Sequence, residues 1–109
     1  EAVCTAIAEH EGLTRDDPAP MASLEAALLW DADKLTKLGV QALAYNLGTP
    51  RMRGRTLAER LASMQTFTAT VLRQTVASMN TEPARALAER RHAEMTAALE
   101  AWARDAHLR

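Results

Sequence analysis

Two aspartates, Asp31 and Asp33, interrupt the otherwise apolar stretch LLWDADKLTKLGV. A carboxylate buried without a partner is strongly disfavoured, so carboxylates in such a stretch are expected to have partners. Carboxylate oxygens are good ligands for hard divalent cations, which can polarise a phosphoryl oxygen and activate a bound water. The stretch is therefore the first candidate in this sequence for a site with chemistry.

The spacing of the two aspartates separates their tasks if the segment is helical. Residues two apart on a helix point roughly 200° away from each other, because each residue turns the chain by about 100°. Asp31 falls on the apolar stripe, whereas Asp33 shares the opposite face with Lys37, with which it could form a surface ion pair. From the residues alone, one aspartate is a ligand candidate and the other has a different role. The stripe consists of Leu28, Leu35, Leu38 and Ala42.

Two basic or imidazole side chains are further candidates for a site. His10 borders the apolar face of the first predicted helix, where a lone histidine is more often a structural residue than a functional one. Arg91 falls on the apolar stripe of the last predicted helix. It is either a phosphate clamp or the internal partner of a buried carboxylate such as Asp31 or Glu25, because arginine suits buried bidentate pairs.

Helical periodicity accounts for most of the chain, and no strand-like alternation competes with it. The pattern therefore predicts an all-α fold in which Gly39 separates two short helices. The segment 13–20 contains two prolines and is predicted to be a loop. The predicted helices span 3–11, 24–32, 40–47, 56–79 and 82–106, the fourth being a continuous helix of about six turns.

Capping signals place the helix ends. Gly12 is typical of a helix C-terminus, and Ser23 is a plausible cap for the second helix. Thr56 and Glu59 form a capping box, and Asn80 or Thr81 caps the last helix, with Pro83 in its first turn. These signals position the elements that carry the candidate residues.

Length, charge and cysteine content restrict the class of protein. The 109 residues form at most one domain, 1–109, and the formal charge of −1 disfavours nucleic acid or an anionic membrane as the primary partner. No apolar run is long enough to span a bilayer. The lone Cys4 forms no internal disulfide and is expected to be a small buried side chain. A cytoplasmic protein is the expectation.

Three stretches carry a resemblance to a known family: VCTAIAEHEG, PAPMASLEAALLWDADKLTKLGV and MNTEPARALAERRHAEMTAALEAW. In this order, and over nearly the whole chain, they resemble the C-terminal half of HD-domain metal-dependent phosphohydrolases of the small bacterial stand-alone type. The most specific part is the stretch 31–35, DADKL, followed by Leu38 and Gly39. The resemblance implies an HD-like helical bundle.

The family holds one or two divalent cations, such as Mn, Mg or Fe, through a histidine, a His-Asp pair and a more distant aspartate. By this resemblance the distant aspartate is Asp33, which precedes a basic residue and a leucine. Asp31, which the apolar stripe favours, is the runner-up. The resemblance places His10, Lys34 and Arg91 near substrate phosphate or a second metal.

The upstream histidine and the His-Asp pair have no counterpart in this sequence. We therefore expect a partial bundle, the C-terminal portion of an HD-type domain without its N-terminal metal-binding helices. Relatives often carry an acid at the position of Thr36 and a basic residue near Tyr45, so this chain departs from the family at both positions.

The function implied by the resemblance is hydrolysis of a phosphoester or phosphoanhydride in a small molecule, with a nucleotide as one candidate, through metal-activated water. The site is incomplete in these 109 residues. The alternative is a non-catalytic helical interaction or regulatory module that keeps the HD scaffold. Its amphipathic helices would pair with another subunit, and association of copies of this chain is a further expectation.

Overall fold

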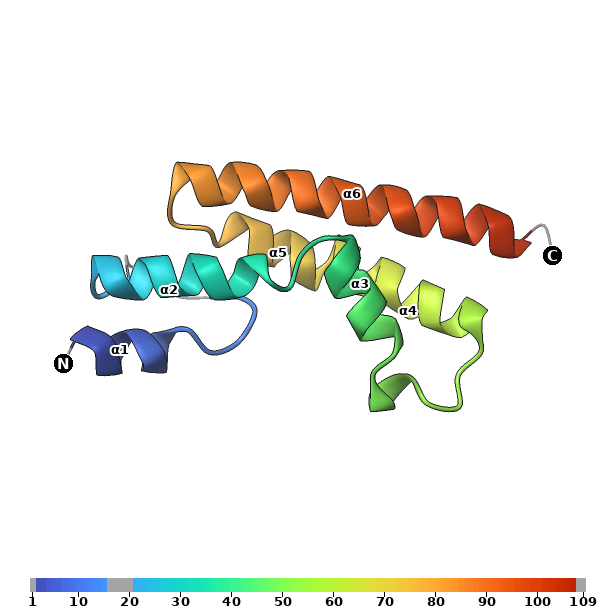
Figure 1. Ribbon diagram of the computed structural model, residues 1–109, viewed down its shortest axis with the longest axis horizontal. Helices are drawn as coiled ribbons and strands as arrows, with labels where there is room; N and C mark the ends of the chain where they lie inside the picture. The colour runs from blue at the N-terminus through green and yellow to red at the C-terminus, as the bar shows by residue number, and fades with distance from the viewer. Residues whose placement is uncertain (1, 16–20, 108–109) are drawn as a thin grey trace.

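The computed structural model describes residues 2–15 and 21–107, and this part of the chain is helical without strands (Figure 1). The all-α prediction is therefore confirmed. Loop residues 16–20, with both prolines of the predicted loop, lie outside the described residues. The elements are α1 (Ala2–Glu9), α2 (Leu24–Leu35), α3 (Val40–Leu47), a 3₁₀ turn η1 (Pro50–Met52), α4 (Leu57–Ala69), α5 (Val71–Ala77) and α6 (Glu82–His107).

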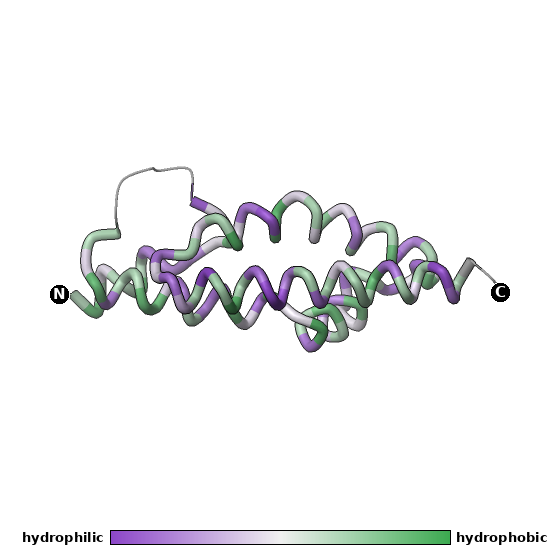
Figure 2. The backbone as a smooth tube through the Cα atoms, turned by 90° about the horizontal axis from the view of Figure 1, so that it is seen from above, coloured by the Kyte–Doolittle hydropathy of each residue, from purple (hydrophilic) through white to green (hydrophobic). Residues whose placement is uncertain are grey.

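The molecule is elongated, with principal extents of 54 × 27 × 21 Å. Its radius of gyration is 15.6 Å, against about 13 Å for a compact domain of this length. Helix α6 is the longest element; the end of α2 and α5 lie beneath its first half and α4 beneath its second half, while α1 and the start of α2 extend past its N-terminal end (Figure 1). Polar and apolar residues alternate around α6 in Figure 2, as expected for a helix that packs on one side only.

The core consists of two separate apolar clusters. The larger one lies between α3, α4, α5 and α6 and includes Leu43, Leu72 and Met95. The smaller one lies between α1 and α2 and consists of Ala6, Met21, Ala26 and Trp30. Because the two clusters do not merge, the joint between α2 and the rest of the fold depends on additional contacts.

Asp31 supplies the central contact of this joint. Its side chain is buried, and one carboxylate oxygen accepts hydrogen bonds from the Asn80 backbone N–H (2.8 Å) and Nδ2 (3.1 Å). The other oxygen accepts from the Thr81 backbone N–H (3.0 Å) and Oγ1 (2.9 Å). Both residues immediately precede α6, so the carboxylate satisfies N–H groups at a helix N-terminus, where negative charge is favourable.

Other polar contacts strengthen the same joint. The Trp30 indole N–H donates to Ser78 Oγ at 2.9 Å, and Asn80 Nδ2 also reaches the Ala27 carbonyl at 3.3 Å. The turn between α5 and α6 is therefore bonded to Ala27, Trp30 and Asp31, which lie on two successive turns of α2. The partners of the buried Asp31 carboxylate thus come from a turn about 50 residues further along the chain.

Most predicted helix ends are confirmed. Ser23 Oγ accepts from the Ala26 N–H at 3.1 Å, and the Thr56–Glu59 capping box is present in both directions. Thr81 Oγ1 accepts from the Ala84 N–H at the start of α6. Gly39 has φ +109°, a conformation that favours glycine, and it separates α2 from α3 as predicted.

The prediction of one continuous helix over 56–79 is wrong. The segment divides into α4 and α5 at Thr70, whose backbone has φ −110° and ψ −80°. The Thr70 hydroxyl donates to the Thr66 carbonyl at 2.7 Å, and β-branched threonines that bond their own backbone weaken helix continuity. The predicted stripe still faces inward, since Leu61, Met64 and Val76 are buried.

The expected apolar face of the first helix is also wrong. Only Ala6 of α1 is buried, whereas Val3 and Ile7 are 65% and 53% exposed and Cys4 is exposed as well. Helix α1 ends at Glu9, two residues before the predicted end. It packs on α2 through its small residue, because Ala6 permits a close approach that larger side chains would prevent.

Replacing Asp31 by alanine is expected to lower the free energy of unfolding by on the order of 3 kcal/mol, because it removes the acceptor of four part-buried hydrogen bonds. Urea denaturation followed by circular dichroism measures the change. Glu25→Ala, which removes an exposed carboxylate from the same helix, serves as the control and should cost less than about 1 kcal/mol. Equal effects of the two substitutions would contradict the assigned role of Asp31.

Candidate functional site

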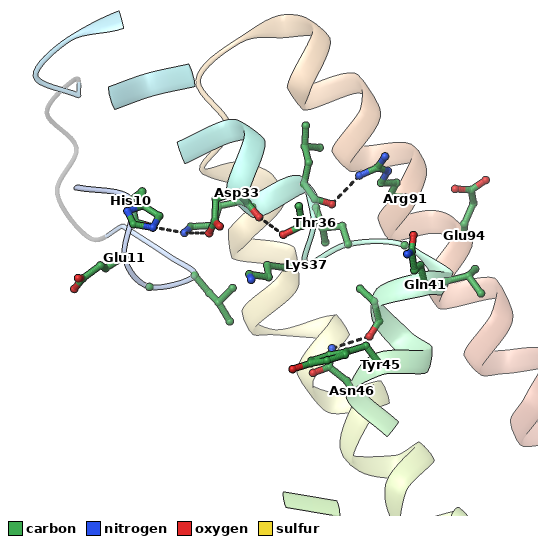
Figure 3. A pocket seen from close by; sticks show the side chains of 18 residues that line it. His10, Glu11, Asp33, Thr36, Lys37, Gln41, Tyr45, Asn46, Arg91 and Glu94 are labelled. Carbon is green, nitrogen blue, oxygen red and sulfur yellow. Dashed lines mark hydrogen bonds and ion pairs between the residues drawn. The ribbon is translucent and has the colours of Figure 1, made fainter. Parts of the chain in front are cut away.

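A broad, open groove of about 1200 Å³ lies where the ends of α1 and α2 meet α3 and α6. It collects residues from four parts of the sequence, including His10, Asp33, Lys37, Tyr45 and Arg91 (Figure 3). Four of the residues singled out in the sequence as site candidates, His10, Asp33, Lys34 and Arg91, therefore line one surface. The bend at Gly39 brings α3 to this surface.

Asp33 is the aspartate that reaches the groove. Its side chain is 31% exposed, whereas Asp31 is buried and bonded to the α6 N-terminus. Helical geometry thus separates the two carboxylates as the spacing predicts. The hydrogen bonding of Asp31 favours a structural role for it, which leaves Asp33 as the carboxylate available to a ligand.

Asp33 forms an ion pair with its neighbour Lys34, at 2.8 Å between Oδ2 and Nζ. The pair with Lys37, which helical spacing suggests, is not formed. Asp33 pairs with Lys34 and not with Lys37 because the Lys34 side chain is only 1% exposed, so its ammonium requires nearby acceptors. It finds them in Asp33 Oδ2 and the His10 carbonyl oxygen, and it lies 4.4 Å from the centre of the Trp30 ring.

This environment lowers the pKa of Asp33 below its usual value of 3.8. The hydrogen bond from Lys34 is the largest cause; partial burial opposes it, and the charges of Lys34, Lys37 and His10 lower the pKa further. Asp33 is therefore ionised at neutral pH, as a metal or proton-accepting carboxylate must be.

His10 occupies the end of the groove beside Lys34 and Asp33 (Figure 3). Its Nδ1 contacts the carbonyl oxygen of Ile7 in the last turn of α1, so the backbone just before His10 orients the ring. Its carbonyl oxygen accepts the hydrogen bond from Lys34. The candidate histidine and the candidate aspartate are thus held together by one buried ammonium.

Arg91 has no ion pair with a carboxylate of the described residues, so the interpretation as the partner of Asp31 or Glu25 is wrong. Its Nη1 donates to the Leu35 carbonyl oxygen at 2.7 Å, at the C-terminus of α2, while Asp31 is bonded to the α6 N-terminus and Glu25 is exposed. A cation at a helix C-terminus is favoured by the helix dipole. The aliphatic part of Arg91 packs against Gly39, and its guanidinium borders the groove.

Three groove residues were not identified as site candidates from their sequence context. Lys37 is exposed, and Gln41 and Tyr45 lie one turn apart on α3, facing the same groove. Only the Gly39 bend could have indicated them, since it turns the start of α3 toward the end of α2.

The described residues do not provide a complete metal site. No group of three or more histidine, cysteine, aspartate or glutamate side chains lies close enough together among residues 2–15 and 21–107 to hold an ion. Asp33 would contribute one oxygen ligand, and its present partner is an ammonium. The donors implied by the family resemblance would thus have to come from outside the described part of the chain.

Comparison of the chain with protein-family models, curated proteins and solved structures gave no significant match. No helix of the described residues combines the length and the apolar character needed to cross a membrane. The site must therefore be interpreted from its own geometry.

Replacing Lys34 by methionine should raise the pKa of Asp33, because it removes the hydrogen bond and charge that lower it most. In the native chain this carboxylate stabilises the fold at pH above 3.8, and the contribution is lost as the pH falls through its lowered folded pKa. Carbon-detected NMR titration of the Asp33 carboxyl group measures its pKa in the native protein and in Lys34→Met.

The matched control is Lys37→Met, which removes a charge that acts on Asp33 only through space. It should raise the pKa of Asp33 by less than Lys34→Met does. The same Asp33 pKa in the native protein and in Lys34→Met would show that the ion pair is absent in solution.

Proposed function

We propose that this chain is the C-terminal part of an HD-type metal-dependent phosphohydrolase that cleaves a phosphoester or phosphoanhydride in a small molecule. The observation that carries the proposal is the position of Asp33: it is the ionised, partly exposed carboxylate at the groove, while the neighbouring Asp31 is occupied in the fold. This is the division of roles that the family pattern requires of the stretch 31–35.

The cations of the groove support a phosphorylated ligand. Lys37 is exposed and forms no ion pair with the described residues, and Arg91 uses one guanidinium nitrogen for the Leu35 carbonyl oxygen. Its remaining N–H groups form no hydrogen bond with residues 2–15 and 21–107, and they can donate to phosphate oxygens, for which the planar guanidinium is suited. In this proposal Lys37 and Arg91 bind the phosphate, and Asp33 is the metal ligand that the chain contributes.

Lys34 holds the aspartate in place for this task. Its buried ammonium bonds Asp33 and the His10 carbonyl oxygen together, so a carboxylate near the end of α2 and the end of α1 have a fixed relation. Lys34 is thus a positioning residue in this proposal, since its ammonium is too buried to bind substrate directly.

The proposal is tested on the complete protein by mass-spectrometric metal analysis and by phosphate release in the presence of Mn²⁺ or Mg²⁺. Asp33→Asn, which keeps the shape and removes the charge, should lose bound metal and at least about 100-fold in activity, because even residues that only orient metal ligands are worth 10–100-fold. Glu11→Gln, an exposed acid of the same groove, is the control and should retain both. Metal and activity that survive in Asp33→Asn would refute the assignment.

A second candidate function, a helical interaction module, is favoured by a different observation. The first two helices expose four large apolar side chains in two one-turn pairs: Val3 and Ile7 on α1, and Leu24 and Leu28 on α2, each between 49% and 67% exposed. Exposed apolar residues gathered on two packed helices are typical of a surface that contacts another protein.

For this second function, Ile7→Glu should convert an associated form of the protein to a monomer, because it places a charge in the apolar contact. Light scattering over a range of protein concentrations measures the change, and Leu57→Glu, at an exposed apolar position at the start of α4, is the control. A native protein that is monomeric at all concentrations would exclude self-association through these helices.

A further inference from the structure

Tyr45 is an exposed aromatic side chain that the fold does not use. It is 74% exposed, the highest value among the exposed large hydrophobic residues of the described chain, and it lines the groove. Its neighbour Asn46, by contrast, is tied to the fold, since Nδ2 donates to the Ala42 carbonyl oxygen at 2.9 Å. The tyrosine ring contributes little to the core and leaves a flat aromatic face at the groove.

Gln41 lies one helical turn before Tyr45, and residues four apart share a helix face. Its side chain is exposed and forms no hydrogen bond to the described residues. An amide has both donors and an acceptor, so it can recognise the edge of a planar heterocycle. The same stretch of α3 thus adds a group capable of hydrogen bonding to the groove, on the side of Glu94 in Figure 3.

Lys37 lies between Asp33 and Tyr45 in the groove (Figure 3). One end of the groove therefore presents a carboxylate and cations, and the other end presents an aromatic ring and an amide. A ligand that contacts both ends has an anionic group at Lys37 and a flat ring at Tyr45. Simple inorganic or sugar phosphates would leave the aromatic end unfilled.

We propose that Tyr45 is a specificity-determining residue, on which an aromatic base of a phosphorylated ligand stacks while Gln41 contacts the edge of that base. This inference rests on the proposed phosphohydrolase function, which it deepens by assigning the part of the ligand that does not react. Stacking on an exposed aromatic side chain tolerates different bases, because every base has a π-face. Gln41 would supply the preference among them.

The test compares two probes that differ only in the base, adenosine 5′-monophosphate and ribose 5-phosphate, by isothermal titration calorimetry on the complete protein with Mn²⁺. The native protein should bind the nucleotide about tenfold or more tightly than the sugar phosphate, as expected for one stacked base. Tyr45→Ala should remove this difference and leave ribose 5-phosphate binding unchanged, whereas Tyr45→Phe, which keeps the ring, should retain it. The exposure of Tyr45 means that neither variant should disturb the fold.

Measuring phosphate release from both probes on the same samples distinguishes the role of Tyr45 in binding from the proposed phosphohydrolase activity. Equal affinity for the two probes in the native protein, or a preference that survives in Tyr45→Ala, overturns the role of Tyr45 even if both probes are hydrolysed. Absence of nucleotide binding also overturns it. If the nucleotide binds through Tyr45 and neither probe is hydrolysed, the binding site stands and the hydrolase function fails.

Discussion

The buried carboxylate of Asp31 at the N-terminus of α6 is the contact on which the arrangement of this fold depends. The two apolar clusters of the protein do not merge, so hydrophobic packing alone does not fix the α1–α2 pair against the larger bundle. Four hydrogen bonds to Asp31 do so in the C-terminal half of α2, and the bond from Arg91 to the Leu35 carbonyl oxygen does so one turn further along the same helix. These contacts hold the C-terminal half of α2 against the bundle, and this is the part of α2 that lines the groove.

The same helix thereby serves structure on one side and the candidate site on the other. Asp31 points into the joint and Asp33 points into the groove, because residues two apart on a helix face nearly opposite directions. Lys34 completes the arrangement: its ammonium is buried between Trp30, the His10 carbonyl oxygen and Asp33, and it ties the end of α1 to the groove. In the stretch 31–35, one face of α2 therefore holds the fold together and the opposite face lines the candidate site.

The sequence predicted the features that depend on neighbours along the chain. Periodicity and capping residues located α2, α3 and the start of α6, because caps such as Ser23 and Thr56 act within one turn. Prediction from the sequence failed where hydrogen-bond partners are distant along the chain, or where a side chain bonds the backbone of its own helix. The donors to Asp31 lie 49 and 50 residues away, Arg91 bonds a carbonyl group that carries no residue-specific signal, and the hydroxyl of Thr70 marks a break that the apolar stripe passes through. Lys34 was placed in the site by resemblance, whereas its burial follows from how α1 packs and could not be read from spacing.

We propose that the cation of an HD-type site binds Asp33 and not Asp31. Anomalous diffraction from crystals of the complete protein grown with Mn²⁺ tests it most directly, because the metal is located without reference to activity. If Asp33 is the metal ligand, a manganese peak should lie within coordination distance of its carboxylate, and the four hydrogen bonds of Asp31 should be unchanged. A peak on Asp31, or a manganese ion bound in the protein away from Asp33, would contradict it.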